Sequence, residues 1–211
     1  MLQVRTSVSG PCFQSPKPSI DRTMVRGFMI MDQKVDYRTN ANAVRQLLRL
    51  TPERFRPYGH VGRAGDGIVK TIRNGGAVLT KSPVPFEHDD LAPDHALEFY
   101  QVRAEGATLT AVQAERHPHS SQMFVPISVE NYLVLVWKDH PETGVVPEAF
   151  VAGPEDVVIY RPGVWHHGII ALGRDGLFAS TMWKTRGGMD TEFLQLPEPE
   201  TFDLGGYRMI A

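Results

Sequence analysis

The sequence predicts an all-β protein, an antiparallel sandwich or small barrel preceded by a short helical or irregular extension. Three observations lead to this prediction. From about residue 60 onward, short runs rich in Val, Ile, Leu, Thr and aromatic residues follow one another. Gly, Pro, Asn and Asp separate these runs at short spacing, as between β-strands. No long run with helical periodicity intervenes, which disfavours an α/β architecture.

Composition narrows the class of protein. A chain of 211 residues is long enough for one domain with a buried core. The net charge of −2 and pI near 6.4 exclude a strongly basic nucleic-acid-binding surface. Basic residues are scattered, and no apolar run approaches the roughly 18 residues of a membrane helix, so no membrane partner is expected. Cys12 is the only cysteine, which excludes an internal disulfide and favours a reducing, cytoplasmic setting.

Two domain-level segments are expected. Residues 1–46 form a partly disordered extension without the apolar core of a signal peptide, and residues 47–211 form the folded domain. The run "AVRQLLRL", residues 43–50, has a short helix-like pattern. Thr51 and Pro52 after it are typical of the cap and first position of a further helical turn. The tail from residue 197 onward is expected to be irregular.

The strands are expected in a regular series. The run "NYLVLVWK", residues 131–138, is nearly all apolar, which is typical of a strand buried on both faces or of a core strand that also contacts a neighbouring subunit. We therefore expect a homodimer in which a β-sheet contributes to the interface. The predicted strands are residues 77–86, 96–104, 107–115, 122–129, 131–138, 148–153, 156–163, 164–172 and 177–184.

The stretch "ERHPHSSQMFVPI", residues 115–127, is the first candidate site. In an extended strand, Glu115, His117 and His119 lie on one face and Arg116 on the other. Pro118 lacks an N–H, so the stretch must be a strand edge or a strand end. Two imidazoles and a carboxylate on one face are chemically a metal-ligand or acid/base set. The alternative is a polar strand end whose charged residues pair across the strands.

The stretch "YRPGVWHHG", residues 160–168, is the second. Pro162 and Gly163 form a turn, after which His166 and His167 face opposite sides of a new strand. Together, the two stretches resemble the paired motifs of cupins, jelly-roll barrels whose imidazoles hold one metal. The glutamate that follows the first pair in cupins is missing from its usual place.

Each remaining candidate residue also has an ordinary structural interpretation. For His119 and His167, both the structural and the functional interpretations stay open. The motif "KTRGG", residues 184–188, would let Arg186 hold a carboxylate by a bidentate fork, or it is a glycine turn with a solvated arginine. Residues expected to be structural are His60, His88, His95, His140, Trp165 and Tyr132.

These elements together resemble the ureidoglycolate lyase family, also called ureidoglycolate hydrolase, over roughly residues 49–200. "LTPERFRPYG", "ERHPHSSQMFVPI", "FVAGPEDVVIYRPGVWHHGIIAL" and "RGG" follow in the family's order. Thr185 departs from the family's usual Asp and His119 from a frequent Leu. The matching positions are Glu115, Arg116, His117, Pro118, Gln122, Phe124, Pro126, Trp165, His166, His167, Arg186, Gly187 and Gly188.

The resemblance implies a dimeric, cupin-like jelly roll that splits ureidoglycolate into glyoxylate and urea during allantoin and purine breakdown. It implies a divalent metal, with nickel the suspected ion. The expected catalytic residues are His117, His166 and Glu115; the expected substrate-binding residues are Arg116, Gln122, Arg186 and Trp165; the expected metal ligands are His117, His119 and His166.

Two other functions fit the same fold. One is a related metal-dependent enzyme acting on another small carboxylate, and the other is a non-enzymatic module that binds a small acid. A fold alone does not separate them, because one barrel hosts many activities.

Overall fold

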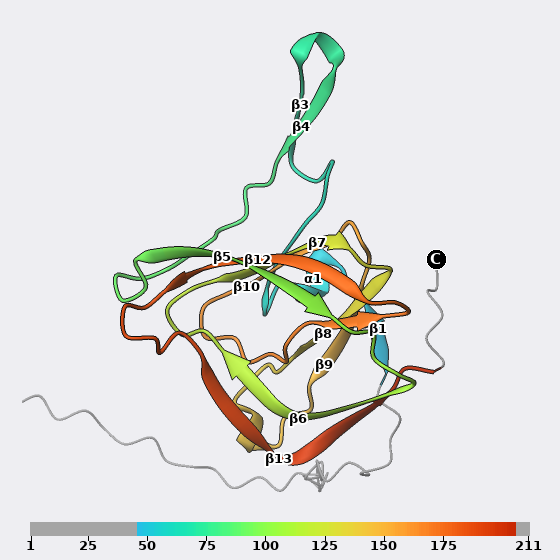
Figure 1. Ribbon diagram of the computed structural model, residues 1–211, viewed down its shortest axis with the longest axis vertical. Coiled ribbons are helices and arrows are strands. Elements are labelled where there is room, and N and C mark those ends of the chain that lie inside the picture. Colours follow the sequence, from blue (N-terminus) through green and yellow to red (C-terminus); the bar gives the residue numbers. More distant parts are fainter. Residues whose placement is uncertain (1–45, 206–211) are drawn as a thin grey trace, which may run out of the picture. The chain divides into compact units, whose positions relative to one another are not determined.

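The computed structural model describes residues 46–205, and nearly all of the regular structure there is β (Figure 1). The expected extension and Cys12 lie outside these residues, apart from the last residue of the extension. No helix in the described range is long and apolar enough to cross a membrane. The strands are β1 Leu47–Arg49, β2 Gly59–Gly62, β3 Ile68–Ile72, β4 Ala77–Lys81, β5 Asp94–Val102, β6 Thr108–Arg116, β7 Gln122–Ser128, β8 Asn131–Val136, β9 Glu148–Ala152, β10 Val157–Tyr160, β11 Ile170–Leu172, β12 Gly176–Lys184 and β13 Glu192–Asp203.

The strands form two main sheets, a two-stranded ribbon and a separate hairpin. The larger sheet has the order β2-β10-β7-β12-β5 and is antiparallel throughout. The second has the order β1-β9-β8-β11, in which only β1 and β9 run parallel. Strands β6 and β13 form the ribbon, and β3 and β4 the hairpin. This confirms the all-β, cupin-like fold class.

The four-stranded sheet is buried on both faces, with the larger sheet on one side and the β6–β13 ribbon on the other (Figure 1). Strand β8 shows why the run "NYLVLVWK" is so apolar. Tyr132 and Val134 point into the core shared with the larger sheet, and Leu133 and Leu135 into the core shared with the ribbon. All four are at most 1% exposed. The run is therefore explained within one chain, and the reason given for a dimer interface there was wrong.

Two local predictions were wrong and one was confirmed. The helix-like pattern before Thr51 forms strand β1, because Leu47–Arg49 pair with Ala149–Val151 of β9. The tail is not irregular, since β13 runs to Asp203 along β6. The helical turn α1, Pro52–Phe55, begins as expected: the Thr51 hydroxyl accepts the Arg54 N–H. Short 3-10 turns cover Arg73–Gly75 and Pro141–Thr143.

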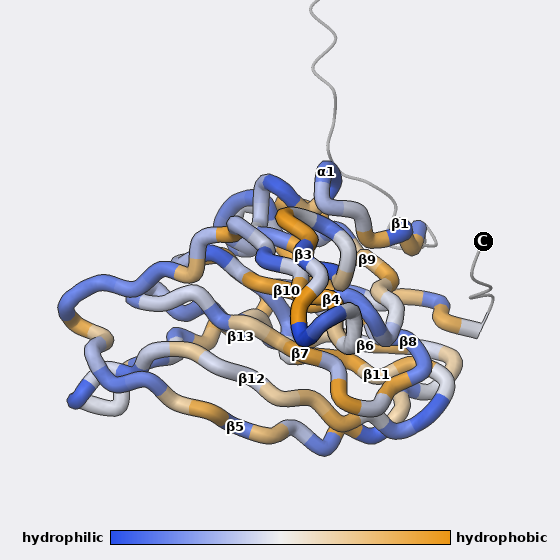
Figure 2. Tube along the Cα trace, turned by 90° about the horizontal axis from the view of Figure 1, so that it is seen from above, coloured by the Kyte–Doolittle hydropathy of each residue, from blue (hydrophilic) through white to orange (hydrophobic). Residues whose placement is uncertain are grey.

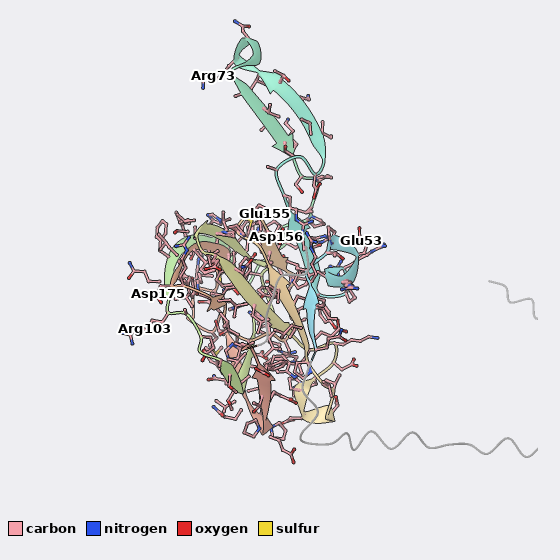
Figure 3. The ribbon with its side chains drawn as sticks, turned by 90° about the vertical axis from the view of Figure 1, so that its right-hand side faces the viewer. Glu53, Arg73, Arg103, Glu155, Asp156 and Asp175 are labelled. Carbon is pink, nitrogen blue, oxygen red and sulfur yellow. The ribbon has the colours of Figure 1, made fainter. Side chains whose placement is uncertain are left out.

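The β3–β4 hairpin was not predicted as a pair. It extends away from the sheets (Figure 1), and both of its strands contain hydrophobic residues (Figure 2). Arg73 lies at its tip (Figure 3). The exposed apolar residues of the hairpin are Ile68, Val69, Ile72, Val78 and Leu79.

Asp156, labelled in Figure 3, connects Arg63, in the segment after α1, to the sheets. Its buried carboxylate accepts Arg63 Nε–H and, at 2.9 Å, the Gly153 N–H. The Tyr132 hydroxyl donates to the main-chain oxygen of Asp156, and Arg63 also reaches the Leu50 carbonyl. Asp156, through its carboxylate and its main-chain oxygen, thus links Arg63 and Tyr132, which lie far apart in the sequence.

Candidate active site

The two histidine-bearing stretches lie side by side. The Glu115 N–H donates to the His166 carbonyl at 2.7 Å, and the His166 N–H donates to the Glu115 carbonyl at 2.8 Å. The Gly163 N–H donates to the His117 carbonyl at 2.8 Å. Gly163 has φ 77°, a left-handed conformation that glycine adopts at little cost, and this turn directs the chain back along β6.

The imidazoles of His117 and His166 form a buried pair. Their side chains belong to residues only 5% and 1% exposed, and their ring centroids are 5.4 Å apart. Tyr160 stacks on His166, with ring centroids 4.1 Å apart and planes inclined by 13°. This packing holds the His166 ring in one orientation.

Hydrogen bonds to carbonyl groups select the tautomer of both rings. His117 Nδ1 lies 3.1 Å from the Asp190 carbonyl oxygen, and His166 Nδ1 lies 2.9 Å from that of Val164. A carbonyl only accepts, so each Nδ1 carries a proton, and the Nε2 of His117 presents a lone pair. Within the described residues, His117 Nε2 is buried and has no hydrogen-bond partner. A buried imidazole nitrogen with a free lone pair fits the role of a metal ligand.

Glu115 completes a three-residue donor set. Its Oε1 lies 3.6 Å from His166 Nε2. The ligand atoms of Glu115, His117 and His166 all lie within 4.8 Å of one another, close enough to hold one metal ion. Imidazole nitrogen and carboxylate oxygen are suitable ligands for divalent transition metals.

Burial sets the protonation of these groups. It lowers the pKa of His166 to about 3, with the neighbouring His117 contributing. Burial lowers the pKa of His117, and the positive charge of Lys184 lowers it further. Burial raises the pKa of Glu115, while the charge of Lys184 opposes that rise. At neutral pH the imidazoles are therefore uncharged and able to bind a metal or accept a proton.

Gln122 is the predicted substrate-binding residue that lies nearest the histidine pair. Its Oε1 is 3.2 Å from His166 Nε2, and its Nε2–H donates to Met182 Sδ at 4.0 Å. Gln122 is 2% exposed and is paired with Tyr160 in the sheet. Gln122 is therefore a buried neighbour that contacts the His166 imidazole.

Other predicted site residues lie elsewhere. His119 is turned away from His117, and its Nδ1 is 2.8 Å from Asp89 Oδ2. The alternation that placed both on one face does not hold, because β6 ends at Arg116 and a turn follows at Pro118. In the arrangement of possible ligands, Glu115 occupies the place that the sequence assigned to His119.

Trp165 and Arg116 face the ribbon rather than the histidine pair. Trp165 packs in the core between the four-stranded sheet and the ribbon. The Arg116 guanidinium lies 4.7 Å from the centroid of this indole and pairs with Glu192, its neighbour on β13. This is the cross-strand pairing that sequence analysis kept as the alternative.

The Arg-Gly-Gly loop holds its arginine outward. The Arg186 side chain is 78% exposed, with Nε 3.6 Å from Asp94 Oδ2. The loop is closed by the Thr185 N–H donating to the Asp190 carboxylate and by the Met189 N–H donating to the Thr185 hydroxyl at 3.1 Å. Its observed contribution to the site is the Asp190 carbonyl, which accepts from His117.

Sequence reasoning missed three polar side chains on the inner faces of β5 and β12. On β5, Glu98 and Tyr100 face inward, and on β12 Lys184 follows Met182 on the inner face. Lys184 Nζ is 3.1 Å from Glu98 Oε1, and the Tyr100 hydroxyl donates to Glu98 at 3.4 Å. Strict alternation along the two strands was the available signal.

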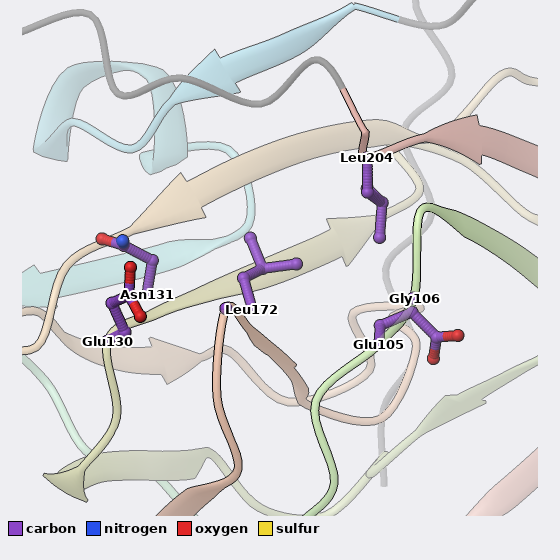
Figure 4. Close-up of a pocket in the computed structure, with 7 residues that line it drawn as sticks. Glu105, Gly106, Glu130, Asn131, Leu172 and Leu204 are labelled. Carbon is purple, nitrogen blue, oxygen red and sulfur yellow. The ribbon is translucent and has the colours of Figure 1, made fainter.

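A separate cavity of about 430 Å³ is lined by backbone and side chains from other segments (Figure 4). None of its lining residues belongs to the histidine pair or its neighbours. The lining residues are Glu105, Gly106, Glu130, Asn131, Leu172, Gly173 and Leu204.

The chain is similar in sequence to known proteins. A family model described as ureidoglycolate lyase matches residues 43–201. A putative ureidoglycolate lyase of Agrobacterium fabrum is 34% identical over 159 residues, covering 74% of this chain and 92% of the relative. A ureidoglycolate lyase of Brucella melitensis is 28% identical over 123 residues, 58% of this chain and 73% of the relative.

Among solved structures, a dTDP sugar isomerase from Desulfovibrio desulfuricans aligns with a TM-score of 0.41 and 16% identity, covering 67% of this chain and 87% of that one. The family match spans both histidine-bearing stretches and all three residues of the donor set. The chain therefore belongs to the ureidoglycolate lyase family.

Proposed function

We propose that this chain is a ureidoglycolate lyase whose chemistry takes place at Glu115, His117 and His166. It splits ureidoglycolate into glyoxylate and urea. The observation that carries the proposal is the buried pair of neutral imidazoles with a carboxylate beside them, inside the part of the chain that matches the family. The two alternatives, another carboxylate-processing enzyme and a non-enzymatic binding module, are not favoured by the relatives.

The reaction requires a base and an acid. The carbinol hydroxyl loses its proton as its O–H electrons form the C=O bond of glyoxylate. The C–N bond breaks, and the departing urea nitrogen gains a proton. A neutral imidazole with a free lone pair suits the first task, and a carboxyl group whose pKa is raised by burial suits the second, provided that neither group is bound to a metal ion.

We further propose that Glu115, His117 and His166 hold a divalent metal. The buried, unpartnered Nε2 of His117 is the feature in the described part of the chain that supports it best. Nickel, the ion implied by the family resemblance, accepts imidazole and carboxylate ligands. When bound, such an ion supplies Lewis acidity to the substrate's hydroxyl and carboxylate oxygens.

The direct test is to incubate the purified full chain with ureidoglycolate and to quantify glyoxylate and urea. Metal content is measured by elemental analysis in parallel, before and after treatment with a chelator. We expect equal amounts of both products and a loss of turnover on metal removal that added metal restores. Turnover by protein that holds no metal would reject the metal proposal and retain the histidines as acid/base groups.

The proposed reaction indicates the pathway in which the protein acts. Splitting ureidoglycolate belongs to allantoin and purine breakdown, and we propose that the protein acts there. The single cysteine, Cys12, supports a cytoplasmic location. Detection of the native protein in the cytosolic fraction of its own cells is the corresponding test.

We also propose a homodimer, formed through the outer face of β5. This strand is an edge of the larger sheet, and Leu97 and Phe99 on its outer face are 63% and 65% exposed. Large exposed apolar side chains on neighbouring positions of an edge strand favour association. Light scattering should give twice the chain mass for the wild type and a single chain mass for the double variant Leu97→Glu, Phe99→Glu.

A further inference from the structure

The proposed substrate carries a carboxylate next to the reacting carbon, so its binding site needs a cation there. The two arginines that sequence analysis assigned to this task are engaged elsewhere. Arg116 pairs with Glu192 over Trp165, and Arg186 points to solvent near Asp94. Neither arginine is placed to bind the carboxylate, so another cationic side chain is the candidate for this task beside the proposed metal ion.

Lys184 lies where that group is needed. It is the last residue of β12, on the same inner face as Ser180 and Met182, which are 0% and 1% exposed. Met182 Sδ lies against the amide of Gln122, which in turn contacts His166. The next inward position along the strand is Lys184, at the open end of the same row of side chains.

The ammonium group of Lys184 is held by two carboxylates without being enclosed. Its Nζ is 3.1 Å from Glu98 Oε1 and 4.0 Å from Asp190 Oδ2, and the side chain is 26% exposed. Asp190 is also the residue whose carbonyl fixes the His117 tautomer. An ammonium group has three N–H donors, so the contact with Glu98 leaves donors for a ligand.

The electrostatics of the pair agree with this placement. The charge of Lys184 acts on Glu115 and on His117, although β12 and β6 are in different sheets. The geometric link is Asp190, whose carboxylate lies 4.0 Å from the Lys184 ammonium group and whose carbonyl accepts from His117. The ammonium group of Lys184 and the proposed metal ion are both positive, so together they favour an anion bound between them.

We propose that Lys184 binds the carboxylate of the substrate, with Glu98 positioning its ammonium group; this inference rests on the proposed function. The preferred ligands are short acids in which the reacting carbon is bonded directly to the carboxylate. Lys184 is thus a specificity-determining residue, and the Arg-Gly-Gly loop that follows it positions Lys184 and Asp190 rather than presenting Arg186.

The test compares Lys184→Met, Lys184→Arg and Lys184→Gln with Lys81→Met, which removes an exposed lysine from the hairpin strand β4. Calorimetry measures the affinity of each metal-loaded protein for glyoxylate, and kinetics measure kcat and KM for ureidoglycolate. We expect the Met and Gln variants to lose about 10- to 100-fold in glyoxylate affinity, as for a lost charge-assisted hydrogen bond. Arg should retain part of the affinity, and Lys81→Met all of it.

Two readouts separate a binding role from a structural one. Metal content and the thermal midpoint should match the wild type in every soluble variant, and the neutral amide of glyoxylic acid should bind wild type and Lys184→Met equally. Wild-type affinity for glyoxylate in both the Met and Gln variants overturns the inference, as does a wild type that binds no glyoxylate.

The same experiment distinguishes the two proposals. Lysine-dependent glyoxylate binding by a wild type that leaves ureidoglycolate intact supports the anion site and rejects the lyase. Normal turnover and normal glyoxylate affinity in the Met variant support the lyase and reject the role of Lys184. Glu98→Gln should raise KM more than it lowers kcat, because it affects only how the ammonium group is held.

Discussion

Glu115 and His166 exchange two main-chain hydrogen bonds, at 2.7 and 2.8 Å, while their side chains approach to 3.6 Å. The backbone pairing fixes the separation of the side chains, because both are attached to one hydrogen-bonded residue pair. Residues 51 positions apart in sequence thus face each other with little freedom. Such rigid support is what a metal or acid/base site requires.

The proposed ligand set predicts a contrast between two neighbouring histidines. Replacing His117 or His166 by Ala should remove the bound metal and lower turnover by at least about 100-fold, the typical contribution of an acid/base group. His119→Leu should leave both unchanged, since its imidazole pairs with Asp89 outside the set. Elemental analysis and initial rates check this for each folded variant. Loss of metal in the Leu variant would restore His119 as a ligand.

The two arginines are expected to be dispensable for substrate binding. Arg186→Met should change KM less than about twofold, because a side chain that is 78% exposed forms only a weak surface ion pair. Arg116→Met should leave KM unchanged but lower stability by about 0.5–1 kcal/mol through loss of the contacts with Glu192 and Trp165. Steady-state kinetics and urea unfolding measure the two effects. A tenfold rise in KM for either variant contradicts the placement of these residues.

Asp156 should matter for stability and not for chemistry. Asp156→Ala leaves Arg63 and the Gly153 N–H without their acceptor, and we expect a loss of about 2–4 kcal/mol in the free energy of unfolding. The adjacent Glu155 is exposed, so Glu155→Ala should change stability by less than about 0.5 kcal/mol. Urea unfolding of both variants gives the comparison. Equal stability of the two would mean that the buried carboxylate contributes no net stabilisation.

Tyr160 offers a test of its buried hydroxyl. Within residues 46–205, this oxygen has no hydrogen-bond partner, although the ring stacks on His166. Leaving a buried hydroxyl unpaired costs about 1–3 kcal/mol, so Tyr160→Phe should be at least as stable as the wild type. We expect turnover to fall, because the hydroxyl lies close enough to Glu115 for its charge to raise the Tyr160 pKa further, after burial. A marked fall in thermal midpoint with full activity would show a purely structural hydroxyl.

The sequence by itself determined most strands of the two main sheets and the residue types of the candidate site. Alternating and continuous apolar runs report burial directly, so β5, β6, β7, β8, β9, β10 and β12 were all predicted near their observed limits. The clustering of histidines around Pro118 and Gly163 located the two stretches that form the site. These are local properties, encoded in the order of neighbouring residues.

Only the tertiary structure decided which side chains meet. Strand alternation placed His119 with His117, but the end of β6 at Arg116 broke that alternation and left Glu115 beside the imidazoles instead. The pairing of β1 with β9 overrode a local helical pattern, because burial of Leu47 and its neighbours against the sheet outweighs the weak preference of a short helix. The register of β12 with β5 and β7 placed the Lys184 side chain next to Glu98. Contacts between distant segments depend on register and sheet packing, which no local pattern specifies.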